Sequence, residues 1–399
     1  MQVIAPGTHH FPAMARVVYG QPAADAVANE VRVADARRVM LLVSSTLNQA
    51  TNEVRKIEQA LGERHAVTVD GIPQHTARTG VAKVTRAALD VGADLLVAVG
   101  GGSVIDAAKM TTLCMQHGMV DEHLEQLDAF EIRLDDSGRL VRPVFDGPTV
   151  RMIAVPSTLN GGEFNSGCLV TDTRRKHKQT FGHPLMVPKA IVLSSDIPAH
   201  TPAPLWLGSA TRALDHAIEA LLSTTPTPLA DAVVLDGIAR MVHALRRWKE
   251  QPDSAEARAE CQVASWLCSY GISSRGPLGG VMMGLSHAVG HVLGGTCGVP
   301  HYFCTPVLMP AVLRWTAPET AHRQRLLARA LGDGAGVAAD LFGAFVRELG
   351  LPSRLHDVGV RPEQFDQIAE LAMHEIFVHG SARKVRGPQD IVEILQMAA

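Results

Sequence analysis

The chain has 399 residues, more than one ordinary hydrophobic core can hold, and this length favours two domains. Hydrophobic residues make up 46% of the sequence and charged residues 19%, which indicates a large buried interior and a buried subunit interface, most simply that of a homodimer. The formal net charge of −3 argues against a nucleic-acid partner, because phosphates are bound by a clustered positive field.

The first residues, MQVIAPGTHHFPAM, contain no basic segment followed by an apolar run, so we expect no secretory signal. The longest apolar stretches are too short to span a bilayer, which argues against a membrane partner. Six cysteines without a CxxC pair suggest reduced thiols, and together these features predict a cytoplasmic protein. Cys297 and Cys304, with His301 between them, lack the spacing of a zinc site; buried small side chains explain the cysteines better.

From residue 37 to about 117, short apolar runs alternate with segments of helical length, which predicts βαβ units and a parallel sheet. The apolar runs are nearly continuous, so we expect helices on both faces of the sheet. Residues 118–150 read as a short helix plus a connecting loop, and residues 157–189 as a loop between two further strands. The expected strands are 37–45, 65–72, 93–100, 151–158 and 190–195; the expected helices are 47–62, 77–92 and one that opens at Ser103.

After about residue 198 the strand signals stop, and segments of helical length are separated by Pro and Gly. We therefore expect an α/β dinucleotide-binding domain over residues 1–197 and a helical domain with a histidine cluster over residues 198–399. The expected helices of the second domain are 204–223, 228–249, 255–274, 302–316, 319–331, 335–349 and 362–376.

The string DLLVAVGGGSVIDAAKM reads as a strand, a glycine turn and the start of a helix. Gly100, Gly101 and Gly102 lack the Cβ atoms that would keep a diphosphate from the backbone. Ser103 is expected to cap the helix, and Asp106 to complete a capping box with it. The N–H groups of the helix start would then face an anion. The spacing is not the usual GxGxxG fingerprint, and a plain tight turn between strand and helix is the alternative.

GGGSVIDAAK resembles the glycine motif GGGSxxDxAK of the iron-containing alcohol dehydrogenase superfamily. GLSHAVGHVLGGTCGVPHYFCTPVLMP is similar to its second signature, in which two histidines fourteen residues apart are metal ligands; here they are His287 and His301, with His291 between them. DHAIEAL, with His216, resembles the helix that supplies another ligand. The resemblance implies the Rossmann-like α/β domain and all-α C-terminal domain of the dehydroquinate synthase-like fold, with the active site between them.

The metal-dependent members carry an Asp four residues before the histidine of HAIEA, and this chain has Arg212 there. A guanidinium cannot ligate a metal and repels a divalent ion nearby. Asp215 is expected to point about 100° away from His216 around the helix. We therefore expect a site without metal; if a metal is bound, its expected ligands are His216, His287 and His301.

Two segments are more similar to the maleylacetate reductase branch, whose members are considered metal-independent. PSTLNGGEF resembles that branch's PTTYAGSEM, and HVLGG after His291 differs from the HPLGA of the alcohol dehydrogenases. Arg212 and the stretch NGGEFNSG depart from typical members, which leaves the substrate open. Membership of this branch would imply a role in the breakdown of aromatic compounds.

The resemblance also implies cofactor contacts outside the glycine motif. Ser44 stands where the family often has an Asp that disfavours NADP, so we expect NADPH to be tolerated beside NADH. A residue at the end of a strand with no contact to the cofactor is the alternative for Ser44. The other expected contacts are Asp70, Gly71, Ser157, Thr158 and Asn160.

The sequence thus predicts an NAD(P)H-dependent oxidoreductase that reduces a small oxo-acid, saturated or unsaturated, such as maleylacetate. Arg212 would bind a substrate carboxylate, and His287 or His291 would donate the proton that follows the hydride. One alternative is a metal-dependent alcohol or aldehyde dehydrogenase that uses His216, His287 and His301. A lyase of the dehydroquinate-synthase type and an inactive nucleotide-binding protein are further alternatives.

Overall fold

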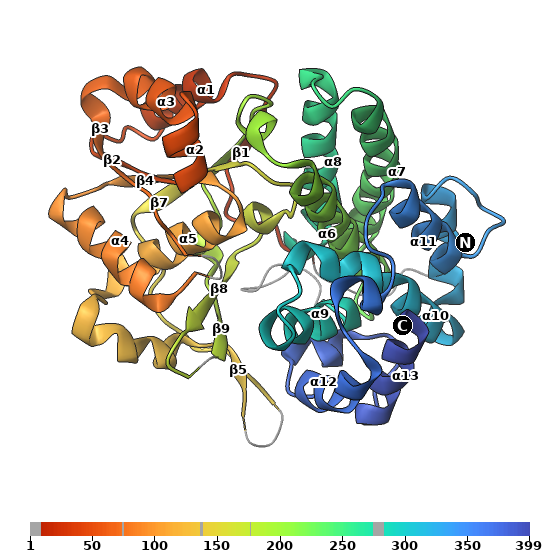
Figure 1. The fold of residues 1–399 in the computed structure, drawn as a ribbon. Coiled ribbons are helices and arrows are strands. Elements are labelled where there is room, and N and C mark those ends of the chain that lie inside the picture. The colour runs from red at the N-terminus through yellow and green to blue at the C-terminus, as the bar shows by residue number, and fades with distance from the viewer. Residues whose placement is uncertain (1–8, 74–75, 136–138, 176, 274–282) are drawn as a thin grey trace. The chain divides into compact units, whose positions relative to one another are not determined.

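The computed structural model in Figure 1 describes residues 9–73, 76–135, 139–175, 177–273 and 283–399. The chain forms two compact units. One comprises Ala13–Ala210 and Arg247–Val263; the other comprises Thr211–Arg246 and Ala264–Ala399, together with the N-terminal residues up to Pro12. Each unit is made of separate stretches of the chain. The expectation of a single domain boundary after residue 197 stays a prediction.

The first unit contains a sheet of six parallel strands in the order β1-β10-β7-β4-β2-β3. Every residue of β2, β4 and β10 is buried, as expected for strands covered by helices on both faces. The strands are β1 Arg16–Tyr19, β2 Val39–Val43, β3 His65–Val69, β4 Leu95–Gly100, β7 Arg151–Pro156 and β10 Ala190–Leu193. The predicted parallel α/β architecture is confirmed.

The helices that follow these strands present apolar stripes to the sheet. In α3, Val54, Ile57 and Leu61 are buried and join a cluster with α1 and the inner residues of β2 and β4. Helices α4 and α5 pack against each other, and α5 packs on β4 and β7. These helices are α1 Ala23–Val33, α2 Ser45–Ala50, α3 Glu53–Leu61, α4 Arg78–Asp90 and α5 Gly102–His117.

The order of the strands reverses direction between β2 and β4. From β2 the chain moves outward to β3, whereas from β4 it moves the other way to β7 and β10. In open α/β sheets, ligands bind outside the carboxyl ends of the strands at such a switch point. Ser44 follows β2 there, and Gly100 ends β4 there.

The segment 157–189 is not the simple loop that we expected. It contains the antiparallel hairpin of β8, Gly167–Asp172, and β9, His177–Gly182. Alternate residues of β8 are buried, and Cys168, Val170 and Phe181 join a core with α5. Six-residue strands with one buried face carry a weak periodic signal, which explains the error.

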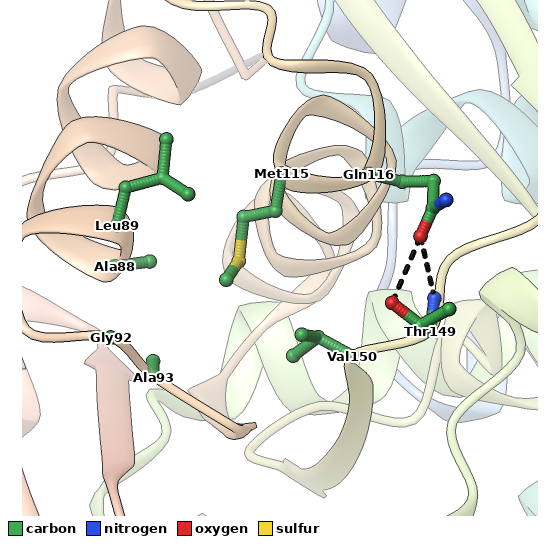
Figure 2. A pocket seen from close by; sticks show the side chains of 8 residues that line it. All are labelled: Ala88, Leu89, Gly92, Ala93, Met115, Gln116, Thr149 and Val150. Atoms are coloured by element: carbon green, nitrogen blue, oxygen red, sulfur yellow. Dashed lines mark hydrogen bonds between the residues drawn. The ribbon is translucent and has the colours of Figure 1, made fainter.

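A hollow of about 470 Å³ lies at the opposite, amino-terminal edge of this sheet, between the ends of α4 and α5 (Figure 2). Gln116 Oε1 accepts hydrogen bonds there from the backbone N and Oγ1 of Thr149, at 3.0 and 2.9 Å. Its lining contains no ionisable side chain, so it offers no acid–base chemistry.

From Ala203 onward, the described residues form only helices and short 3-10 turns, and the predicted helical character is confirmed. One cluster of buried apolar side chains joins α9, α10, α12 and α13. The helices are α6 Ala203–Leu222, α7 Pro228–Glu250, α8 Ala255–Ser273, α9 Leu285–Thr296, α10 His301–Ala330, α11 Ala338–Glu348, α12 Phe365–Ala372 and α13 Pro388–Ala398. Within the described residues, no helix has both the length and the apolar character that a membrane span requires.

Two expected helices, 302–316 and 319–331, are parts of the single helix α10. This helix continues through Pro306, Pro310 and Pro318. Each proline removes a backbone hydrogen bond. Val307, Leu308 and Trp315 are nevertheless buried in the core of this unit, and packing of this kind outweighs the local preference for a break.

Candidate active site

The carboxyl ends of three neighbouring strands are joined by backbone hydrogen bonds. Ser44 N donates to Val99 O at 2.9 Å, and Ser157 N donates to Gly100 O at 3.0 Å. A Cβ atom at Gly100 would lie 3.3 Å from Ser44 Cβ. The strand-end residues that the sequence analysis singled out around β2, β4 and β7 are therefore brought together.

Helix α5 begins at Gly102, with Gly101 as its N-cap and no side-chain hydrogen bond to the helix start. The expected capping box is wrong: Ser103 lies inside the first turn, and Asp106 Oδ2 accepts from Leu169 N at 3.3 Å instead. The glycines let the helix start earlier than the side-chain pattern suggests. The first N–H groups remain available to an anion, as the predicted diphosphate site requires.

The loop after β7 lies directly against this turn. A Cβ atom at Gly102 would be 2.5 Å from Asn160 Nδ2, and one at Gly101 would be 3.5 Å from Thr158 Cγ2. Thr158 Oγ1 donates to Asn160 Oδ1 at 3.3 Å. Ser157, Thr158 and Asn160 therefore border the glycine turn.

Asp70 follows β3 and is held by side chains of α2. Its Oδ2 accepts from Asn48 Nδ2 at 2.9 Å and from Gln49 Nε2 at 3.4 Å. Gly71 has a φ of 83°, in the left-handed region, and its N–H donates to Ser45 Oγ at 2.9 Å. The carboxylate thus has partners within the chain, and its contact with a cofactor stays a prediction.

In the other unit, the four predicted histidines lie in a row. The ring centroids of His216 and His287 are 5.0 Å apart, those of His287 and His291 6.5 Å, and those of His291 and His301 5.8 Å. His216 lies on α6, His287 and His291 lie on α9, and His301 begins α10. Burial lowers the pKa of His216 and His287 well below the usual value, with Arg212 adding to the effect, so both rings are neutral.

Arg212 is buried and forms an ion pair within α6. Its Nη1 donates to Asp215 Oδ2 at 2.8 Å and lies 3.5 Å from Thr305 Oγ1. The same Asp215 oxygen accepts from Ser286 Oγ at 3.0 Å and from Thr305 Oγ1 at 2.7 Å. Among the donors of Arg212, only Nη1 is hydrogen-bonded within the described part of the chain. Nε and Nη2 are left for another acceptor.

Asp215, expected to point about 100° away from His216 around the helix, nevertheless contacts the histidine row. Its Oδ2 lies 3.5 Å from His287 Nδ1, and the residue is fully buried. Residues 211–221 of α6 are all buried, so adjacent positions both face the interior and the 100° step does not separate them. Burial raises the pKa of this carboxyl.

Glu219 links α6 to the start of α9. Its carboxylate accepts from Gly284 N at 2.7 Å, Ser286 N at 2.8 Å and His287 Nδ1 at 2.6 Å. Because a carboxylate oxygen accepts here, Nδ1 of His287 carries the proton and Nε2 presents a lone pair. Burial raises the pKa of Glu219 to about 7.

Glu375 and Phe377 also belong to the site and were missed by sequence reasoning. His291 Nδ1 lies 3.0 Å from Glu375 Oε2, and the Phe377 ring is 5.3 Å from that of His291 and 6.1 Å from that of His287. Both residues lie at the 3-10 turn Ile376–Gly380, far from the histidines in sequence. No local pattern in the sequence points to Glu375 or Phe377. For Asp215 and Glu219 there was such a pattern, because together with Arg212 they are charged residues three and four positions apart on the otherwise apolar helix α6.

The described residues contain one group of three side chains with metal-ligand spacing: Asp215, Glu219 and His287, whose ligand atoms all lie within 4.8 Å of one another. His216 and His301, which the family pattern suggests, are not in it. Asp215 Oδ1, His216 Nδ1 and His287 Nε2 are buried without a hydrogen-bond partner in the described part of the chain. The two carboxylates and one imidazole of Asp215, Glu219 and His287 suit Zn²⁺ or Fe²⁺. The expected absence of a metal is therefore not supported, since Asp215 supplies the carboxylate that position 212 lacks.

The sequence matches the two halves of one family. Residues 14–195 match the model described as iron-containing alcohol dehydrogenase, and residues 208–399 match the C-terminal model of the Fe-containing alcohol dehydrogenase family. The chain belongs to the iron-containing alcohol dehydrogenase family.

The proteins similar to this chain are named as different enzymes. The chain is 28% identical to maleylacetate reductase 1 of Cupriavidus pinatubonensis, over 90% of this chain and 89% of that protein. It is 26% identical to lactaldehyde reductase of Escherichia coli, over 95% and 97%. The crystal structure of maleylacetate reductase from a Rhizobium species superposes with a TM-score of 0.81 at 25% identity, over 100% of this chain and 98% of the other.

We expect the Gly101→Ala variant to fold normally but to lose NADH affinity by at least about tenfold. The new methyl group meets Thr158 at ordinary contact distance, so the fold tolerates it, whereas a bound diphosphate does not. Calorimetric titration with NADH measures the effect. Gly387→Ala, with open space around its Cβ, is the control. Unchanged affinity in Gly101→Ala would place the diphosphate elsewhere.

Replacing Arg212 tests the metal site. We expect Arg212→Ala to bind Zn²⁺ or Fe²⁺ at least about tenfold more tightly than the parent, because the cation paired with Asp215 is gone. Asp215→Asn should weaken metal binding by a similar factor. Equilibrium dialysis with elemental analysis measures both. Equal metal binding by all three proteins would mean that this group of side chains holds no ion.

Proposed function

We propose that this member of the iron-containing alcohol dehydrogenase family is an NAD(P)H-dependent reductase of small oxo-acids. The observation that carries the proposal is Arg212, a buried guanidinium whose Nε and Nη2 have no hydrogen bond among the described residues, in contact with the network that holds His287. A guanidinium binds carboxylates in a bidentate manner. Relatives named maleylacetate reductase and lactaldehyde reductase support reduction of small carbonyl compounds.

A bound dihydronicotinamide would supply the hydride that the substrate accepts. The hydride acceptor is the carbonyl carbon or, in an α,β-unsaturated oxo-acid, the β-carbon of the double bond that is conjugated with the carbonyl group. In both cases negative charge develops on the carbonyl oxygen, and one proton must follow. Arg212 stabilises the substrate carboxylate and the developing charge, since a positive group in a buried site interacts strongly with both.

Of His287 and His291, His291 is the better proton donor. His287 holds its only proton on Nδ1, in the bond to Glu219, so its Nε2 accepts. His291 has a carboxylate partner at 3.0 Å, which stabilises the doubly protonated ring that donates from Nε2. Hydride addition to the carbonyl carbon with protonation of the oxygen would yield NAD(P)⁺ and the hydroxy acid, and addition to the β-carbon with protonation of the α-carbon would yield NAD(P)⁺ and the saturated oxo-acid.

The coenzyme choice follows from Ser44 at the switch point of the sheet. The side chain carries no charge at the position where a carboxylate would repel the 2′-phosphate of NADPH. We propose that both NADH and NADPH are accepted.

A metal-dependent alcohol or aldehyde dehydrogenase is the second candidate, favoured by the group of Asp215, Glu219 and His287. A divalent ion held there would supply Lewis-acid polarisation of a carbonyl or alcohol oxygen. In that candidate, Arg212 would tune the charge around the ion rather than bind substrate.

The deciding experiment compares oxo-acids, unsaturated oxo-acids and neutral aldehydes of equal length. We expect NADH and NADPH to be oxidised fastest with an oxo-acid, with kcat/KM at least about tenfold above that of the matched aldehyde, because only the acid engages Arg212. Spectrophotometric assays before and after chelation separate the two candidates. A preference for neutral aldehydes that is lost on chelation would establish the metal-dependent alternative.

Arg212→Lys tests the carboxylate contact directly. The charge is kept but the bidentate geometry is lost, so KM for oxo-acids should rise by about tenfold while KM for the matched aldehyde stays within about twofold. Steady-state kinetics with the two substrates measures this difference. An equal rise for both would mean that Arg212 only maintains the structure through Asp215.

A further inference from the structure

Lys109 is a fully buried ammonium group in α5, about two turns after the glycine turn. Its Nζ donates to the carbonyl oxygens of Gly162 at 2.6 Å, Asn165 at 2.8 Å and Gly167 at 2.8 Å, and lies 3.3 Å from Asn165 Oδ1. An ammonium has three protons, so these oxygens saturate it. Four oxygens of one short segment therefore surround one buried positive charge.

This arrangement resembles the binding of a monovalent cation. Backbone carbonyl oxygens that converge on one point repel one another unless a positive charge lies between them. Two buried carboxyls, Asp106 and Glu163, interact electrostatically with the same ammonium group. Without the positive charge of Lys109, the buried carbonyl oxygens and these two carboxyls would have no cation to offset their negative charge.

The segment that Lys109 holds is the continuation of the loop after β7. Earlier in that loop, Ser157, Thr158 and Asn160 border the glycine turn, and Asn160 lies against Gly102. Other hydrogen bonds also anchor the loop: Leu159 N donates to Ser209 Oγ at 3.0 Å, Thr201 Oγ1 donates to Ser157 O at 2.7 Å, and Ser157 N donates to Gly100 O at 3.0 Å. None of these ties it to α5, whereas Lys109 does.

We propose that Lys109 is a positioning residue for the nicotinamide half of the cofactor. The N-terminus of α5 would face the diphosphate, and Lys109 on the same helix fixes the loop of Ser157, Thr158 and Asn160, to which the family resemblance assigns contacts on the nicotinamide side. The distance between the two halves of the cofactor site is thereby set by one helix and one internal cation. This inference rests on the proposed dinucleotide-dependent function.

The test compares two ligands, NADH and ADP-ribose, which share the diphosphate but differ in the nicotinamide. Lys109→Met removes the charge and keeps most of the side-chain length. We expect it to weaken NADH binding by at least about tenfold and ADP-ribose binding by no more than about twofold. Calorimetric titration of the full-length protein measures both. Thr111→Val, two residues away on α5 and buried with no hydrogen-bond partner for its hydroxyl among the residues that the structure describes, is the matched control and should leave both affinities unchanged.

Rescue by a free cation distinguishes positioning from simple packing. Lys109→Ala leaves space at the oxygens, so ammonium chloride should restore part of its NADH affinity, whereas choline chloride at equal ionic strength should not. If both Lys109 variants fail to fold, Asn165→Ala removes one of the four oxygens around Lys109 together with the acceptor of Gly167 N, and leaves the three carbonyl oxygens in place. It should lower NADH affinity by about threefold without affecting ADP-ribose.

The results of these binding experiments distinguish failure of this inference from failure of the proposed function. Equal weakening of NADH and ADP-ribose, or no rescue by ammonium, would overturn the positioning role and leave Lys109 a structural residue. If the parent protein binds ADP-ribose but neither NADH nor NADPH, both the proposed function and this inference fail. If the parent binds NADH and Lys109→Met binds it equally well, only the inference fails.

Discussion

Charged side chains on the buried helix α6 must be neutralised without water, and the arrangement of the histidine unit follows from that constraint. Arg212, Asp215 and Glu219 lie on a stretch whose residues are all buried. An unpaired buried charge costs several kcal/mol, so each of them needs close partners. Asp215 takes Arg212, Ser286 and Thr305, and Glu219 takes the first N–H groups of α9.

The same interactions orient the chemistry. Because Glu219 caps α9 and also accepts from His287, the position of the helix and the tautomer of the ring are fixed together. His291, one turn further along α9, is then held by Glu375 from a distant part of the chain. The row of histidines is thus a consequence of how two buried carboxylates are satisfied.

The sheet unit also contains a buried charge that needs close partners, here the positive charge of Lys109. Lys109 is buried among backbone carbonyls rather than carboxylates at hydrogen-bond distance, and its partners belong to one loop. In both units a buried charge fixes a segment that borders the proposed chemistry. Arg212 has a second consequence, because it neutralises Asp215 and so sets how strongly that carboxylate attracts a metal ion.

The parallel α/β unit, the helical remainder, the glycine turn and the family could all be predicted from the amino-acid sequence. These features are local: continuous apolar runs, helical spacing, and glycines at one strand end can be read without knowing what packs against them. Four features could not be predicted and are seen only in the folded chain: the hairpin β8–β9, the unbroken α10, the cap at Gly101 and the inward direction of Asp215. Each of these depends on partners distant in sequence, such as Leu169 for Asp106 or Glu375 for His291. Burial and hydrogen bonding to those partners outweigh local preferences of a few tenths to a few kcal/mol, and they exist only once the chain has folded.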